Sequence, residues 1–138
     1  LQLYNYKGTV HSYNKDITEA IKQFMTAVRI AKEVNMKTEV VNEYNYALLM
    51  ALKKDRLTYE PILNEAFEYG YSFSDEDLKI INLSFIASTY LDKTYSLDSS
   101  KRDEISKRMS DLYGEDWQLS TKELAAKLDA EYSLRNQK

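Results

Sequence analysis

Apolar residues recur at helical spacing along almost the whole chain, and this periodicity is the strongest constraint on its fold. Residues 17–34 place eight of them on one stripe, at the i, i+3, i+4 and i+7 spacing of a helix: Ile17, Ala20, Ile21, Phe24, Ala27, Val28, Ala31 and Val34. No segment shows the apolar–polar alternation that is typical of a half-buried strand. The pattern predicts an all-α fold.

The periodic segments and the turn residues between them predict seven helices. Their expected ranges are 1–13, 17–34, 38–54, 58–69, 75–91, 101–113 and 121–135. The expected N-caps, whose side-chain oxygens suit the unpaired amides of a first turn, are Asp16, Thr58 and Ser74. Pro61 is expected in a first turn, where its missing N–H costs nothing. The expected helix terminators are Asn35, Gly70 and Gly114.

The composition argues against several kinds of catalytic site. The chain has no cysteine, one histidine and three glycines. It therefore cannot form a disulfide, a thiolate zinc site or a multi-histidine metal centre. The glycines lie too far apart for a glycine-rich phosphate loop. We expect no catalytic residue, no metal and no cofactor.

Charge and hydropathy limit the classes of partner. The net charge is −3, and neither half of the chain carries a basic patch, so direct nucleic-acid binding is not expected. No apolar run reaches the roughly 18–20 residues of a membrane-spanning helix, and no signal peptide is visible. The sequence therefore predicts a cytoplasmic protein without a membrane partner.

Three charged or polar clusters could suggest chemistry, and each has a structural interpretation that we favour. His11 lacks a neighbouring nucleophile, because adjacent helical residues such as Ser12 point about 100° away. We interpret His11 as a packing residue. The run Asp75–Asp77 fits carboxylates at a helix N-terminus. The pairs Lys101–Arg102 and Lys107–Arg108 fit a solvated helix face of mixed charge.

An internal repeat of 39–40 residues divides most of the chain into helix–turn–helix units. When Gly8 is placed over Ala47, the pair Lys15–Asp16 falls on Lys54–Asp55. A weaker third unit places Ala87 over Ala47. The predicted organisation is one domain over residues 1–138, with units at about 1–35, 38–70 and 74–113 and a capping helix at about 121–135.

The first unit resembles the tetratricopeptide repeat (TPR) family. The residues that carry the resemblance are Tyr4-x2-Lys7-Gly8-x2-His11 followed by Ala20-x3-Phe24-x2-Ala27. In the second unit they are Asn45-Tyr46-Ala47-Leu48-Leu49. The resemblance implies three stacked antiparallel helical hairpins with a C-terminal capping helix. It also implies a non-catalytic interaction or scaffold module that binds a peptide or a helix in a concave groove.

The resemblance assigns the groove to the first helix of each unit. The implied partner-binding residues are Asn5, Thr9, Ser12, Tyr44, Leu48, Ala51, Ser84, Ser88 and Leu91. The family's charged clamp for a terminal carboxylate is matched here by Asn45 alone, so the expected ligand is neutral or apolar. Among the twelve tyrosines, Tyr46 and Tyr90 are expected to be wedges between helices, and Tyr44 a groove contact.

Three alternatives remain open from the sequence. One is an enzyme that uses carboxylates alone, those of Asp75, Glu76 and Asp77. The chain begins without a methionine inside a periodic pattern, which fits a C-terminal regulatory or peptide-sensing domain of a larger, DNA-binding regulator of bacterial type. The last predicted helix, with its apolar stripe from Leu124 to Tyr132, would either cover the end of the stack or pair with a second copy as a homodimer.

Overall fold

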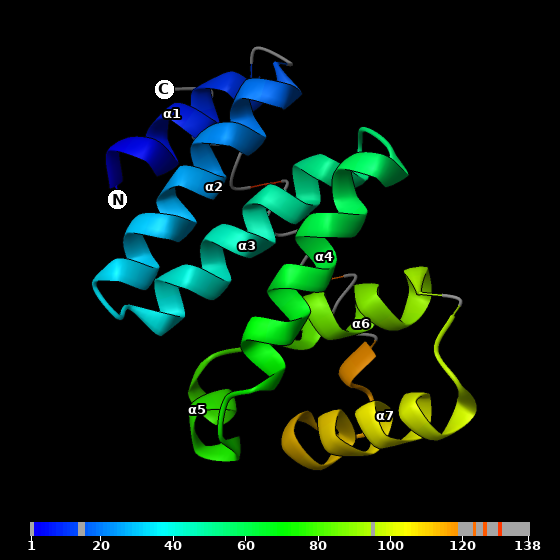
Figure 1. Cartoon of the computed structure of the whole chain (residues 1–138). Helices are drawn as coiled ribbons and strands as arrows, with labels where there is room; N and C mark the ends of the chain where they lie inside the picture. The colour runs from blue at the N-terminus through cyan, green and yellow to red at the C-terminus, as the bar shows by residue number, and fades with distance from the viewer. Residues whose placement is uncertain are drawn as a thin grey trace.

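The computed structural model describes residues 2–13, 16–94 and 96–118, together with Glu123, Ala126 and Ala130; of residues 2 and 11–13 it describes the backbone alone. The described ranges form helices and no strand (Figure 1). The helices are α1 (Gln2–Tyr13), α2 (Ile17–Glu33), α3 (Lys37–Leu52), α4 (Arg56–Tyr71), α5 (Asp75–Ile80), α6 (Ser84–Lys93) and α7 (Ser99–Tyr113). The predicted all-α class is confirmed. Apart from those three residues, the expected capping helix at 121–135 lies outside the described residues.

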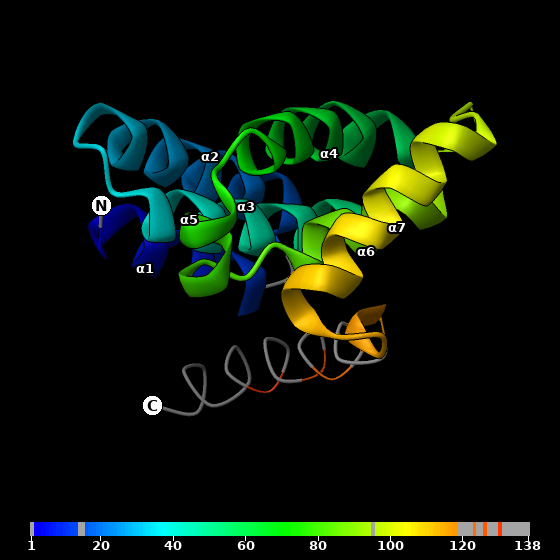
Figure 2. The same cartoon turned by 90° about the horizontal axis from the view of Figure 1, so that it is seen from below.

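The helices pack mainly against their neighbours in the chain. α1 contacts α2, α2 contacts α3, and α3 contacts α4; the series continues from α4 to α6 and from α6 to α7. Two layers result. α1, α3 and α6 form the α1–α3–α6 layer, and α2 and α4 lie over it (Figure 2). Among the described residues, no helix combines the length and the apolar character needed to cross a membrane.

Side chains cap most of the helix starts. Asp16 accepts from the Glu19 amide at 3.4 Å and Ser74 from the Asp77 amide at 3.2 Å, as predicted. The predicted cap at Thr58 is wrong, because Asp55 accepts from the Thr58 amide at 2.9 Å and α4 already begins at Arg56. Pro61 therefore lies inside α4, past the first turn.

Two of the three predicted helix terminators are correct. Asn35 and Gly114 end helices with positive φ values of 57° and 96°. Gly70 is instead buried inside α4, where an added Cβ would lie 2.2 Å from a methyl carbon of Leu83. Gly8 makes the same kind of close approach in α1, against the ring of Phe24. These two glycines let helices come together where any side chain would clash.

The predicted helix over 75–91 is broken in two. α5 ends at Ile80 and α6 begins at Ser84. The Tyr113 hydroxyl fills the break, because it lies 2.7 Å from the Leu78 carbonyl oxygen and accepts from the Leu83 amide at 3.1 Å. A side chain from α7 thus provides the partners that a continuous helix would have supplied.

Two arginines of α7 hold the ends of other helices. Arg108 donates at 2.6 Å to the carbonyl oxygens of Tyr71 and Phe73, just past the end of α4, and forms an ion pair with Asp75. Arg102 donates to the carbonyl oxygens of Leu91 and Thr94 at the end of α6. The interpretation of these arginines as a solvated charged face is therefore wrong, because they satisfy helix-end carbonyls.

Candidate functional site

The residues that were predicted to line a groove are largely inaccessible in this structure. Tyr44, Leu48 and Ala51 are fully buried, and Leu91 belongs to the same core. The polar members Thr9, Ser84 and Ser88 are buried as well. Asn5 is half-buried, and the side chain of Ser12 lies outside the described residues. The set forms no open groove in this structure.

Tyr44 packs toward α2 and α4. Its hydroxyl donates to the Glu65 carboxylate at 2.8 Å, and its ring lies 5.9 Å from that of Tyr69. The Lys32 ammonium sits 5.0 Å from the centre of the Tyr44 ring. Burial, followed by the hydrogen bond to Glu65, raises the pKa of Tyr44 far above its ordinary value. Tyr44 is therefore a core residue here, and its predicted role as a groove contact does not hold in this arrangement.

The two predicted aromatic wedges do pack between helices. The ring of Tyr90 in α6 stacks on Phe67 of α4, with centroids 3.8 Å apart and planes 3° apart. The ring of Tyr46 in α3 lies 5.5 Å from that of Phe24 in α2. Both rings therefore join helices of different layers.

Within the described ranges, every buried polar side chain belongs to the α1–α3–α6 layer. They are Thr9, Glu43, Asn45, Ser84, Ser88 and Thr89. Some of them bond locally: Thr9 and Thr89 donate to carbonyl oxygens one turn earlier, and Ser84 donates to Asn82. Asn5 joins α1 to α3 by donating to Glu43 at 2.7 Å. This layer therefore holds the buried polar side chains of the described helices.

Asn45 is a further member of this polar set. Its side chain is 6% exposed, and no group among the described residues donates a hydrogen bond to its amide oxygen. A buried acceptor without a donor costs about 1–3 kcal/mol. An N–H group from a ligand would remove that cost.

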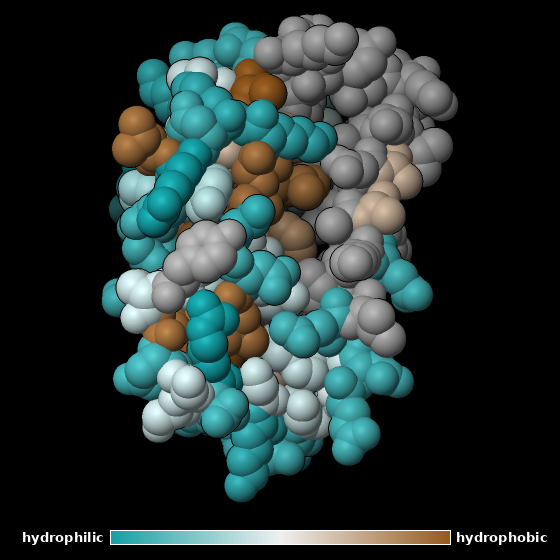
Figure 3. Space-filling model, turned by 90° about the vertical axis from the view of Figure 1, so that its right-hand side faces the viewer, coloured by the Kyte–Doolittle hydropathy of each residue, from teal (hydrophilic) through white to brown (hydrophobic). Residues whose placement is uncertain are grey.

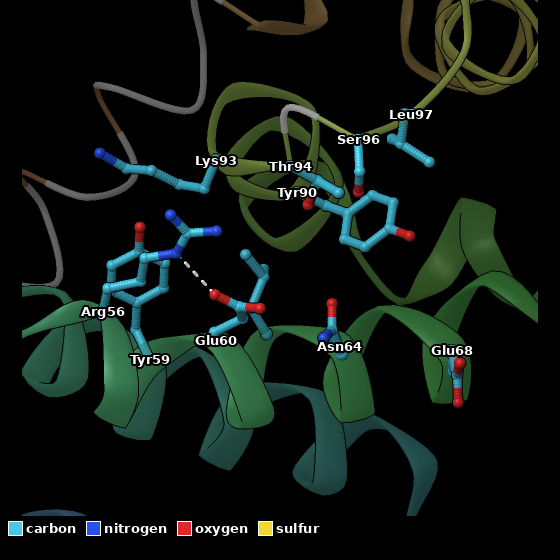
Figure 4. A pocket seen from close by; sticks show the side chains of 11 residues that line it. Arg56, Tyr59, Glu60, Asn64, Glu68, Tyr90, Lys93, Thr94, Ser96 and Leu97 are labelled. Carbon is cyan, nitrogen blue, oxygen red and sulfur yellow. Dashed lines mark hydrogen bonds and ion pairs between the residues drawn. The ribbon is translucent and has the colours of Figure 1, made fainter.

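A cavity of about 640 Å³ lies between α4 and α6, and we refer to it as the α4–α6 cleft (Figure 4). From α4 it is lined by Arg56, Tyr59, Glu60, Leu63, Asn64 and Glu68. From α6 and the residues after it come Tyr90, Lys93, Thr94, Ser96 and Leu97. Arg56 and Glu60 form an ion pair of 2.7 Å along α4. The side of the molecule toward the α6–α7 connection is mainly hydrophilic, with separate hydrophobic patches (Figure 3).

A second hollow, of about 410 Å³, lies between the α2–α3 turn and α5. Lys37 and Asp77 bridge it with an ion pair of 3.1 Å. Met36 and Ile80 leave apolar surface exposed beside this pair. Of its polar lining residues, Lys37 and Asp77 are already paired with each other.

The carboxylates of the 75–77 run do not assemble as a catalytic group. Asp75 pairs with Arg108 and Asp77 with Lys37, so their side chains are drawn to different neighbours. In the part of the chain that the structure describes, no three histidine, aspartate or glutamate residues converge as metal ligands. The side chain of His11 lies outside the described residues.

The chain matches no known protein family, no curated protein and no solved structure. Its function must therefore be argued from its own residues.

Sequence reasoning missed the α4–α6 cleft, although one signal was present. Arg56, Glu60, Asn64 and Glu68 recur every four residues and mark a polar stripe along one face of α4.

Proposed function

We propose that the chain is a non-catalytic protein–protein interaction module built as a TPR-like stack of hairpins. The units of the stack would be α1–α2, α3–α4 and α6–α7. The order of packing supports this proposal, because in an α-solenoid each unit contacts only its neighbours. Gly8 supports it as well, since it falls where the family's repeat has a glycine and touches Phe24 of the same unit.

The observation that carries the proposal is the unpartnered amide oxygen of Asn45. In native proteins a buried acceptor rarely lacks a hydrogen-bond donor, and an acceptor without one marks strain or function. On the α1–α3–α6 layer, an asparagine in this state is suited to accept from a backbone N–H of a bound peptide or helix. Because few charged groups accompany it, the partner segment should be neutral or apolar.

Binding at this surface requires it to be uncovered. The six buried polar side chains of the α1–α3–α6 layer are at most 7% exposed, so a partner cannot reach them in the arrangement described above. We expect association to be coupled to a conformational change, which lowers the association rate below the usual 10⁵–10⁷ M⁻¹s⁻¹.

The test is crosslinking in the native cells with a tagged full chain, followed by mapping of the crosslinked residues. We expect crosslinks on α1, α3 and α6. Asn45→Ala should reduce the amount of captured partner about five- to tenfold, which corresponds to one lost hydrogen bond. Asn42→Ala is the matched control, because Asn42 lies on the same helix with its side chain exposed. Crosslinks confined to α2 and α4, around Gln23 or Glu65, would contradict the proposal.

A further inference from the structure

The α4–α6 cleft carries charges of opposite sign at its two ends. Arg56 and Lys93 lie at the end where α4 begins, and Glu68 lies at the other end (Figure 4). Among the described residues, Lys93 and Glu68 take part in no ion pair, and the Lys93 ammonium lies 6.0 Å from the centre of the Tyr59 ring. Because Arg56 is already paired with Glu60 at 2.7 Å, Lys93 is the charge that can attract an anion at its end, and Glu68 can attract a cation at the other.

Apart from Glu60, whose carboxylate is paired with Arg56, the wall between the two ends is uncharged. The Tyr90 ring is held by its stacking on Phe67, so it presents a fixed aromatic surface. Asn64 points its amide toward the space between the ends, and an amide can both donate to and accept from a peptide backbone. Leu97 adds apolar surface on the α6 side. This combination suits a ligand with a polar backbone and apolar side chains.

The separation of the charges sets the length of such a ligand. Glu68 follows Arg56 by about three helical turns, or about 18 Å along α4. An extended peptide advances about 3.3 Å per residue, so five to seven residues would span roughly this distance. The cavity volume of about 640 Å³ lies within the usual range for ligand sites, roughly 300–1,000 Å³.

We propose that the α4–α6 cleft binds a short free peptide of about five to seven residues in an extended conformation. Its terminal carboxylate lies at Lys93, beside the Arg56–Glu60 ion pair, and its terminal ammonium lies at Glu68. Free termini supply the two charges at the separation that the cleft offers, whereas an internal segment of a folded partner has no terminal charge. The residues that line the cleft are not the buried polar residues of the α1–α3–α6 layer, so the two proposals can fail separately.

The test uses the full chain and an equimolar pool of unblocked hexapeptides that carry alanine, leucine, valine, serine, phenylalanine or tyrosine at each position. Peptides retained with the protein on ultrafiltration are identified by mass spectrometry. We expect a subset of the pool to be retained. The same pool with acetylated N-termini and amidated C-termini should be retained at least about tenfold less, because both end charges are gone.

Variants locate the retained peptides in the cleft. Lys93→Ala and Glu68→Gln should each weaken retention about three- to fivefold, as expected for partly exposed ion pairs. Asn64→Trp places an indole in the cleft from an exposed position and should abolish retention. The matched controls Lys22→Ala and Glu33→Gln change exposed charges on α2 and should have no effect. Circular dichroism checks that every variant remains helical.

Three results would overturn the proposal: no peptide retained at 1 mM total pool, equal retention of the blocked pool, or unchanged retention by Asn64→Trp. Asn45→Ala should leave retention unchanged. A loss with Asn45→Ala and none with Lys93→Ala or Glu68→Gln would place the peptide on the α1–α3–α6 layer and overturn the assignment to the cleft.

Discussion

The two halves of the stack are held together by different interactions. α1 to α4 pack through interdigitated apolar side chains, with Phe24 fitted against Gly8 and Tyr46. α5 to α7 depend more on side chains that bond to backbone carbonyls, namely Arg102, Arg108 and Tyr113. The difference shows that one layered fold can combine a conventional core with helix ends that are satisfied from a distant element.

The largest effect is expected from Phe24→Ala in the first half. Phe24 is fully buried, so removal of its ring should lower the free energy of unfolding by about 3–5 kcal/mol. Urea denaturation measures this loss. Leu57→Ala is the control, because that side chain is 89% exposed and should contribute less than about 0.5 kcal/mol. A loss below 1 kcal/mol for Phe24→Ala would mean that the first half is not held by its core.

Arg108→Ala tests the second half. The substitution leaves the carbonyl oxygens of Tyr71 and Phe73 without their donor, and we expect a loss of about 2–3 kcal/mol. Hydrogen exchange should increase in α5 and α7 more than in α1 and α2. Arg108→Lys should not restore stability, because an ammonium cannot reproduce the planar fork. The neighbouring, exposed Lys107→Ala serves as the control. An equal increase of exchange in α1 and α2 would show that both halves unfold as one unit.

Tyr113→Phe isolates a single hydroxyl at the α5–α6 break. We expect a loss of about 1–2 kcal/mol, because the Leu83 amide loses its acceptor while the ring stays in place. Thermal unfolding measures the loss. If stability is unchanged, the break is maintained by packing alone.

Tyr44→Phe should act mainly at alkaline pH. The pKa of Tyr44 is raised in the folded state, so the unfolded chain loses its proton first, near pH 10. Stability should therefore fall as the pH rises above about 10, by up to about 1.4 kcal/mol per pH unit from this group. Tyr44→Phe should make that decline shallower. An identical pH profile for the variant would contradict the burial of this hydroxyl.

The sequence predicts the first half better than the second. Local signals are enough for α2 and its ends, since Asp16, Asn35 and the apolar stripe all lie within one segment. The α5–α6 break has no such signal, because its partner, Tyr113, follows about thirty residues later. The roles of Arg102 and Arg108 are hidden for the same reason.

The candidate sites were predictable only in part. Helical periodicity places Tyr44, Leu48 and Ala51 on one face of α3, but it cannot tell which neighbouring elements cover that face. Tyr44 illustrates the difficulty, since an aromatic ring with a hydroxyl suits an interface and a core equally well. The α4–α6 cleft depends on how far apart two helices lie, and this separation follows from the Phe67–Tyr90 stack and from Gly70, which no local pattern reveals.

The donors that α7 provides to α4 also bear on synthesis. The ribosome releases the chain from its N-terminus, so α4 emerges well before Arg108 does. Until then, water must satisfy the carbonyl oxygens of Tyr71 and Phe73. We expect α1 to α4 to assemble first, and the end of α4 to become fixed only when α7 has left the exit tunnel.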